Sequence, residues 1–122
     1  MEVKEVLEWT FFSECEIPQD VKSMLVSEEV AISAYQTFRD CAIFTNKRLI
    51  IRDVEGLTGR KKEIFTIPYK SILMYSTENG GVIDINQEIE IWTMIGNLKI
   101  KLKKDIDIRK FDNLLAEVVL NG

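Results

Sequence analysis

The chain has 122 residues, of which 46% are hydrophobic and 30% are charged, and its net charge is −4. This length suits one domain with its own core and is short for two. The mildly acidic composition argues against a nucleic-acid partner. The sequence contains no histidine, which removes the commonest acid–base group and the commonest metal ligand. We therefore expect one folded domain without a metal, a cofactor or a nucleic-acid partner.

The two cysteines, Cys15 and Cys41, occur in no Cys-x-x-Cys spacing, so the sequence shows no redox or metal motif. A single disulfide between them is one alternative, and two reduced thiols in a cytosolic protein is the other. No apolar run approaches the ~20 residues of a membrane span. The acidic residues Glu2 and Glu5 stand where a secretory signal has basic ones. These features predict a cytoplasmic protein.

Residues 1–25 are expected to form a helical lead-in to the main domain, which covers residues 26–122. Within residues 3–12, Val3, Leu7 and Phe11 fall on one helical stripe. Pro18 suits the first turn of a second, shorter helix over residues 19–25.

From residue 30 the apolar residues recur with the period of a strand rather than that of a helix. Turn signals separate the strands: two glycines within residues 55–60, Pro68, and the Asn-Gly-Gly sequence at 79–81. This pattern predicts about seven strands, over residues 30–38, 41–46, 49–54, 62–67, 71–76, 83–95 and 98–103.

The last two strands are expected to form a hairpin around a two-residue turn at Gly96 and Asn97. In that register Ile91 lies opposite Leu102 on the inner face. The outer face then pairs Trp92 with Lys101, Met94 with Lys99 and Glu90 with Lys103.

After residue 105 the period changes back to that of a helix. One apolar stripe runs from Ile108 through Phe111 and Leu115 to Val118, and Asp107 is placed to cap its first turn. The sequence thus predicts a mainly β domain with a bent antiparallel sandwich or barrel that a C-terminal helix covers.

Three segments of this strand-rich chain support a family resemblance: TNKRLI at 45–50, GLTGRK at 56–61 and IPYKSI at 67–72. In this order they resemble the bacterial pleckstrin-homology family of small uncharacterised proteins, over roughly residues 26–120. The resemblance implies a bent pair of antiparallel sheets, nearly a barrel, with the C-terminal helix plugging one open end. It also implies ring-like homo-oligomers and no established catalytic residue.

A basic cluster of five residues is a candidate patch for anionic lipid or phosphate: Lys47, Arg48, Arg60, Lys61 and Lys62. Pleckstrin-homology domains that bind inositol phosphates project basic residues mainly from their first hairpin loop. The corresponding loop here is Arg39-Asp40, which departs from that pattern. The alternative for this cluster is a set of solvated charges.

Three large apolar residues, Trp9, Trp92 and Met94, are candidates for an oligomer interface. Trp92 and Met94 are expected on a face otherwise made of glutamates and lysines. The alternatives are packing onto the domain's own core and simple exposure. Charge is also uneven, with a net of −6 over residues 1–29 and +4 over residues 30–70. That asymmetry suits either complementary surfaces between subunits or solvated faces.

The functional hypothesis is a non-catalytic, self-assembling interaction module, and the alternative is a peripheral anionic-lipid or phosphate-binding domain. An enzyme is not expected, because no nucleophile–base pair can be named. Glu88 and Glu90 lie two residues apart on a strand opposite lysines, as in a solvated ladder. The Gly56-x-x-Gly59 spacing of an RNA-clamping loop here joins two strands and indicates a hairpin turn.

Overall fold

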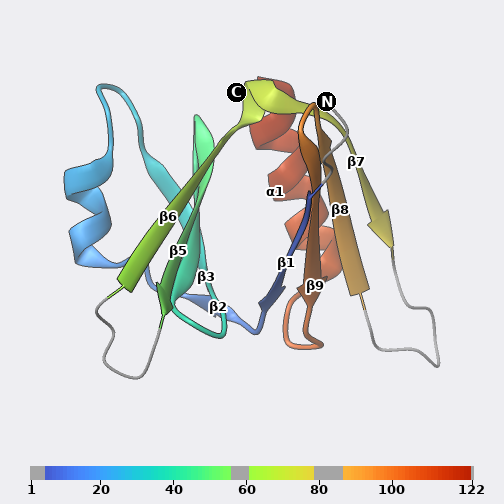
Figure 1. Cartoon of the computed structure of the whole chain (residues 1–122), viewed down its shortest axis with the longest axis horizontal. Coiled ribbons are helices and arrows are strands. Elements are labelled where there is room, and N and C mark those ends of the chain that lie inside the picture. Colours follow the sequence, from blue (N-terminus) through green and yellow to red (C-terminus); the bar gives the residue numbers. More distant parts are fainter. Residues whose placement is uncertain (1–4, 56–60, 79–86, 122) are drawn as a thin grey trace.

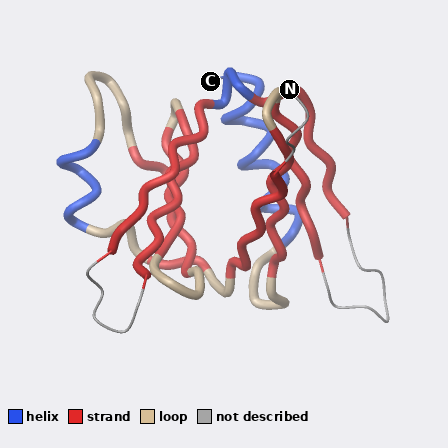
Figure 2. Tube along the Cα trace, in the orientation of Figure 1, coloured by secondary structure: helices blue, strands red, loops and turns tan. Residues whose placement is uncertain are grey.

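Two β-sheets face one another in the computed structural model, and one α-helix packs beside them (Figures 1 and 2). The structure describes residues 5–55, 61–78 and 87–121. The four-stranded sheet has the order β1-β9-β8-β7 and the five-stranded sheet the order β2-β3-β4-β5-β6. The elements are β1 (Glu5–Phe11), β2 (Glu14–Cys15), the 3-10 helix η1 (Gln19–Met24), β3 (Ala31–Gln36), β4 (Cys41–Thr45), β5 (Arg48–Glu55), β6 (Lys61–Pro68), the 3-10 turn η2 (Tyr69–Ser71), β7 (Ile72–Glu78), β8 (Gln87–Thr93), β9 (Gly96–Leu102) and α1 (Ile108–Asn121).

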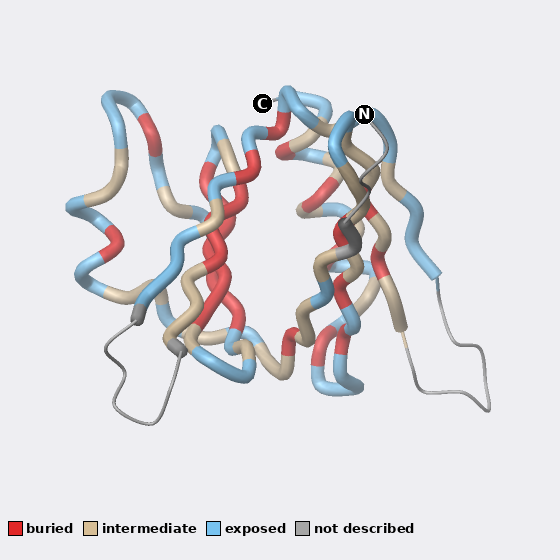
Figure 3. The backbone as a smooth tube through the Cα atoms, viewed as in Figure 1, coloured by how far each residue is buried: buried red, intermediate tan, exposed pale blue. Residues whose placement is uncertain are grey.

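Seven strands, β3 to β9, and the C-terminal helix form the main domain as predicted, but a closed barrel is not confirmed. The strand predicted over residues 83–95 is observed as β8 over 87–93, and residues 83–86 lie outside the described residues. Within the described residues no strand of one sheet pairs with a strand of the other. The sheets meet at two corners instead. At one, η2 connects β6 to β7, and at the other the Phe12 amide donates to the Gln36 carbonyl at 2.8 Å. The architecture is an open sandwich whose inner faces carry the buried residues (Figure 3).

The expectation of a helical lead-in is wrong for residues 5–11, which form the strand β1, whereas the shorter helix expected after Pro18 is present as the 3-10 helix η1. Leu7, Trp9 and Phe11 pack toward the core at a spacing of two, while Glu8 between them is exposed. Strand β1 pairs in parallel with β9, from Glu5 opposite Gly96 to Phe11 opposite Leu102. Leu7 and Phe11 also fit a helical spacing. As a strand, however, residues 5–11 bond to the backbone N–H and C=O groups along the edge of β9, which would stay unpaired if these residues formed a helix.

The 3-10 helix η1 follows Pro18 and covers the outer face of the five-stranded sheet. Val21 from η1 is fully buried there, against a second apolar cluster made of Ala34, Cys41, Ile43 and Ile50. Every residue of β4 is therefore buried, since one of its faces lies in the main core and the other lies under η1. This second core explains why β4 shows no polar alternation in the sequence.

The last hairpin keeps the predicted faces but not the predicted register. The turn lies at residues 94–95, and Ile91 pairs with Leu98 rather than with Leu102. The partner is thus four residues away from the predicted one, and an even shift leaves every side chain on its face. On the outer face the shift places Glu90 opposite Lys99 and Glu88 opposite Lys101, two opposite-charge pairs that favour the observed register.

The C-terminal helix α1 begins as predicted. Asp107 caps it, because its Oδ1 accepts hydrogen bonds from the backbone amides of Arg109 at 3.0 Å and Lys110 at 3.3 Å. Phe111, Leu115 and Val118 are buried against the sheets. The Phe111 ring lies 5.2–5.9 Å from three other rings, those of Phe11, Tyr35 and Phe44. This aromatic cluster joins α1 to both sheets.

Replacing Phe111 with alanine is expected to lower the free energy of unfolding by about 3–5 kcal/mol, because it opens a cavity between the sheets and α1. The corresponding fall in melting temperature is roughly 10 °C or more. Thermal unfolding followed by circular dichroism measures this directly. A melting temperature within two degrees of the wild type would mean that α1 is not docked through Phe111.

Candidate interaction surfaces

The predicted basic patch is dispersed over the five-stranded sheet. Lys47 is exposed in the turn between β4 and β5, whereas Lys62 lies opposite Val54 near the other end of the β5–β6 hairpin. Six residues of strand separate these two ends, which is roughly 20 Å. Arg60 lies outside the described residues, and only the backbone of Lys61 is described. Lys47 and Lys62 therefore do not form one anion-binding surface.

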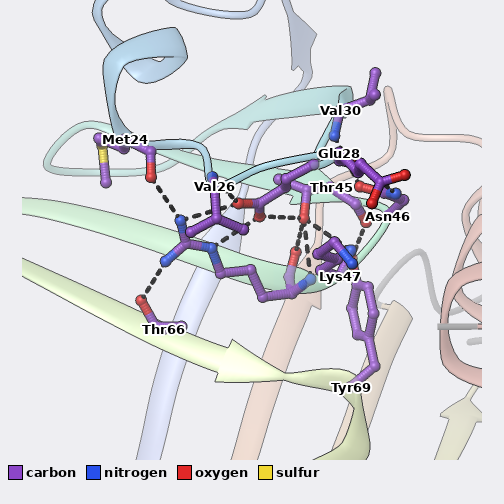
Figure 4. A network of polar contacts seen from close by, with 11 residues as sticks. Met24, Val26, Glu28, Val30, Thr45, Asn46, Lys47, Thr66 and Tyr69 are labelled. Carbon is purple, nitrogen blue, oxygen red and sulfur yellow. Dashed lines mark hydrogen bonds and ion pairs between the residues drawn. The ribbon is translucent and has the colours of Figure 1, made fainter.

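The fifth member of the predicted patch, Arg48, is bound within the subunit, where its contacts include Met24 and Thr66, both labelled in Figure 4. Its Nε lies 2.8 Å from Oε2 of Glu29, and its Nη2 donates to Oε1 of Glu29 at 3.2 Å. The same guanidinium donates to the carbonyl of Met24 at 2.9 Å and to the hydroxyl of Thr66 at 3.2 Å. Arg48 thus ties the segment after η1 to β5 and β6, and its role is structural.

The side chain of Glu29 is completely buried. Besides the bonds from Arg48, its oxygens accept hydrogen bonds from the Val26 amide at 2.9 Å and the Thr45 hydroxyl at 2.7 Å. Burial alone raises the pKa of Glu29, but the hydrogen bonds from Arg48, Val26 and Thr45 outweigh it and lower the pKa to about 2. The preceding residue, Glu28, has a positive φ of 64°. Its carbonyl accepts a bond from the Asn46 amide group at 3.1 Å, which helps to hold this turn.

Arg52 makes a second set of ion pairs, in which the carboxylates are less buried than that of Glu29. Its Nε lies 2.6 Å from Oδ2 of Asp40, and its Nη1 lies 2.8 Å from Oδ2 of Asp20 in η1. Acidic residues of the first 29 therefore pair with basic residues of the next 41 inside one subunit. The uneven charge of the sequence is satisfied partly within the fold, which weakens it as an argument for complementary surfaces between subunits.

Replacing Arg48 with methionine is expected to lower the free energy of unfolding by about 3–5 kcal/mol, because the buried Glu29 carboxylate loses its partner. Urea unfolding at pH 7 measures the loss. The matched control is Lys47→Met, which removes a neighbouring exposed charge and should stay within about 0.5 kcal/mol of the wild type. Equal effects of the two substitutions would refute a structural role for Arg48.

The contribution of Glu29 to the stability of the fold should be lost over a defined range of acidic pH. Because its folded pKa of about 2 lies below the ordinary value of 4.5, this carboxylate stabilises the fold above about pH 4.5 and loses that effect as the pH falls toward 2. Glu29→Gln should therefore cost about 3 kcal/mol at pH 7 and progressively less between pH 4.5 and pH 2.5. The exposed neighbour variant Glu28→Gln serves as the control in the same urea series. A cost for Glu29→Gln that is independent of pH would contradict this assignment.

The three predicted interface residues lie in different places. Trp92 is on the outer face of the four-stranded sheet, opposite Met74 of β7. Trp9 packs toward the core on the inner side, and its ring meets that of Phe65 edge-on at 5.3 Å. Met94 is 86% exposed at the tip of the β8–β9 turn. The structure thus divides the predicted interface between an outer face and an inner groove.

The groove has a volume of about 660 Å³ and opens between the start of β1, the end of β6 and the β8–β9 turn. We call it the apolar groove. Apolar side chains make most of its walls: Leu7, Trp9, Phe65, Ile67, Pro68, Leu73, Met94, Ile95 and Leu98. Lys70 in η2 is the one charged side chain among the described residues that line it. Its volume lies within the range of small-molecule pockets, and its lining is mostly apolar.

The second surface, which we call the β7 face, consists of the free edge of β7 together with Met74 and Trp92. Strand β7 ends its sheet, and among the described strands it pairs with β8 alone. Met74 is 56% exposed, and Trp92 opposite it is half-buried. Our sequence interpretation missed Met74 and Lys70. The unbroken apolar run at residues 72–75 was an available signal, since a strand with one solvated face normally alternates.

The two cysteines lie on different strands of the five-stranded sheet. Cys15 on β2 and Cys41 on β4 are separated by β3, a distance of about 9 Å or more across the sheet, which exceeds the reach of a disulfide. Both thiols are free, and burial raises the pKa of Cys41 to about 12. The described residues contain no group of side chains suited to a metal ion. Across the same segments no helix is both long and apolar enough to span a membrane.

An open two-sheet sandwich with one C-terminal helix is the architecture of pleckstrin-homology domains, and solved structures agree. A DUF1696 family protein with a pleckstrin-homology domain from Shewanella loihica PV-4 superimposes with a TM-score of 0.79 at 30% identity, covering 88% of this chain and 96% of that one. A pleckstrin-homology domain from Shewanella amazonensis SB2B gives a TM-score of 0.69 at 32% identity, covering 83% and 93%.

The chain belongs to the bacterial PH domain family, whose sequence profile matches residues 2–119. The match includes β1, so the first strand is part of the family domain. The uncharacterized protein YjqA of Bacillus subtilis (strain 168) is 36% identical over 107 residues, which cover 85% of this chain and 86% of that protein. Domains of this fold are typically non-catalytic.

Proposed function

We propose that this protein is a non-catalytic interaction module that assembles with copies of itself through the β7 face. The observation that carries the proposal is an open seven-residue strand edge beside exposed apolar side chains. An open edge presents unpaired backbone N–H and C=O groups to any strand that approaches. Met74 and Trp92 supply the apolar contact next to it, and glutamate–lysine pairs of the same face supply a polar rim.

Two other long strands end their sheets, β1 and β6, and both carry charges; in β1 the exposed Glu8 lies at the middle of the strand. Strand β6 carries Lys62 and Glu63 in its first half and ends at Pro68, and charges and proline discourage the pairing of whole strands. In β7 only the final residue, Glu78, is charged, and there is no proline. This difference favours β7 as the strand that meets another subunit.

Contacts through β7 that run head-to-tail would close into a ring when the rotation between subunits allows it. Assembly of identical subunits needs no ligand and no reacting group, which suits a fold that is typically non-catalytic. Binding of anionic lipid is the weaker proposal, because Arg48 is engaged by Glu29 and Lys47 lies far from Lys62.

Met74→Lys is expected to convert the assembly into 14.1 kDa monomers, because a lysine on an open strand blocks the approach of a second one. Trp92→Ala should weaken each contact by about 2 kcal/mol or more. Size-exclusion chromatography with light scattering gives the mass, and circular dichroism shows whether the fold is retained.

Val26→Lys is the matched control, since Val26 is 59% exposed on a different part of the molecule. The control should assemble as the wild type does. A wild-type chain that is monomeric at every concentration, or an unchanged mass for Met74→Lys, would refute assembly through the β7 face.

A further inference from the structure

The apolar groove runs along the edge of β6 rather than over one face of the sheet. Successive side chains of a strand point to opposite faces, yet four consecutive residues, 65–68, line the groove. Part of its wall is therefore the backbone edge itself. Strand β6 ends its sheet, so the N–H and C=O groups on this edge have no strand partner in the described part of the chain. An occupant must meet these polar groups as well as the apolar side chains.

The groove also carries a single positive charge. Lys70 is exposed, and none of the ion pairs between described residues involves it. Among the described lining residues no carboxylate accompanies it. An apolar site with one unpaired cation is complementary to an occupant with an apolar body and one negative group.

We propose that the apolar groove binds an extended apolar peptide segment, which adds to β6 as a short strand and places a carboxylate next to Lys70. An alkyl chain would cover the edge without bonding to its N–H and C=O groups, at a cost for each group it removes from water. A peptide strand satisfies those groups and places alternate side chains in the groove. Pro68 at one end and the charged pair Lys62 and Glu63 at the other restrict the added strand to residues 64–67 of β6, roughly 13 Å.

This inference goes beyond self-assembly, because the groove and the β7 face use different strand edges. The probe is an acetylated hexapeptide of alternating threonine and valine with a free C-terminal carboxylate, together with its C-terminal amide form. Titration into the ¹⁵N-labelled protein should shift the amide signals of residues 64–67 and slow the hydrogen exchange of those amides that point away from β5, as new interstrand bonds require. The amide form should bind about two- to fivefold more weakly, the range expected for one exposed ion pair.

Two variants test the parts of the site. Lys70→Gln should bind both peptides as tightly as the wild type binds the amide form, which abolishes the preference for the carboxylate. Ile95→Asn should weaken both peptides about tenfold, since it removes one apolar wall. The control for Ile95→Asn is Leu120→Asn, because Ile95 and Leu120 have nearly equal exposures of 76% and 77% and Leu120 lies on α1.

Several results would overturn the proposal. The first is no change at residues 64–67 with millimolar peptide. Displacement of the peptide by decanoate, without exchange protection of β6, would assign the groove to an amphiphile. If the amide signals of the groove residues shift when the protein concentration is raised without peptide, the occupant of the groove would be a second copy of the chain. Shifts confined to β7 would place the peptide on the other edge.

Discussion

An open β-sheet leaves a row of unpaired backbone groups at each edge, and in this protein nearly every other feature follows from how those edges are treated. The two sheets do not close on one another in the described residues, so four edges need cover. Strand β1 covers the edge of β9 and becomes the edge strand itself, with the exposed Glu8 at its middle, and β2 covers part of β3 with two residues. Strand β6 relies on charges and on Pro68. Strand β7 presents a seven-residue edge with one charged residue, no proline and the exposed Met74, and this difference connects the fold to its proposed assembly.

Ion pairs hold η1 and the segment after it in place over the five-stranded sheet. Glu29 and Arg48 connect the segment after η1 to β5, and Asp20 and Arg52 connect η1 itself to the same strand. The buried Glu29–Arg48 pair contributes little net stability compared with apolar packing, but removing one partner is costly, whereas the Asp20 side chain is largely exposed. Both pairs therefore act mainly as constraints on where η1 lies over the five-stranded sheet. Arg48, which the sequence offered as a residue for an anionic partner, instead pairs with Glu29 and helps to hold the segment after η1 on the five-stranded sheet.

Much of the fold could be predicted from apolar periodicity, and the misses have identifiable physical causes. Leu7 and Phe11 satisfy both a helix and a strand, so only the neighbouring edge of β9 decides between the two. In the last hairpin the alternation fixed the faces of Ile91 and Leu98 but left registers that differ by an even number equally acceptable. The candidate surfaces were harder to predict from the sequence, because the order of strands in the sheets decides which side chains share a surface. Trp9 and Trp92 look equivalent in the sequence, and only the order of the strands separates an inner groove from an outer face.

The central claim is that another copy of the chain covers the edge of β7. Hydrogen exchange of the β7 amides over a wide range of protein concentration tests this most directly, because edge amides exchange quickly unless a partner strand protects them. The account predicts that the outward amides of β7 become protected as concentration rises, whereas those of β4, inside its sheet, stay equally slow throughout. Protection of β7 that does not change from dilute monomer to concentrated solution would contradict it.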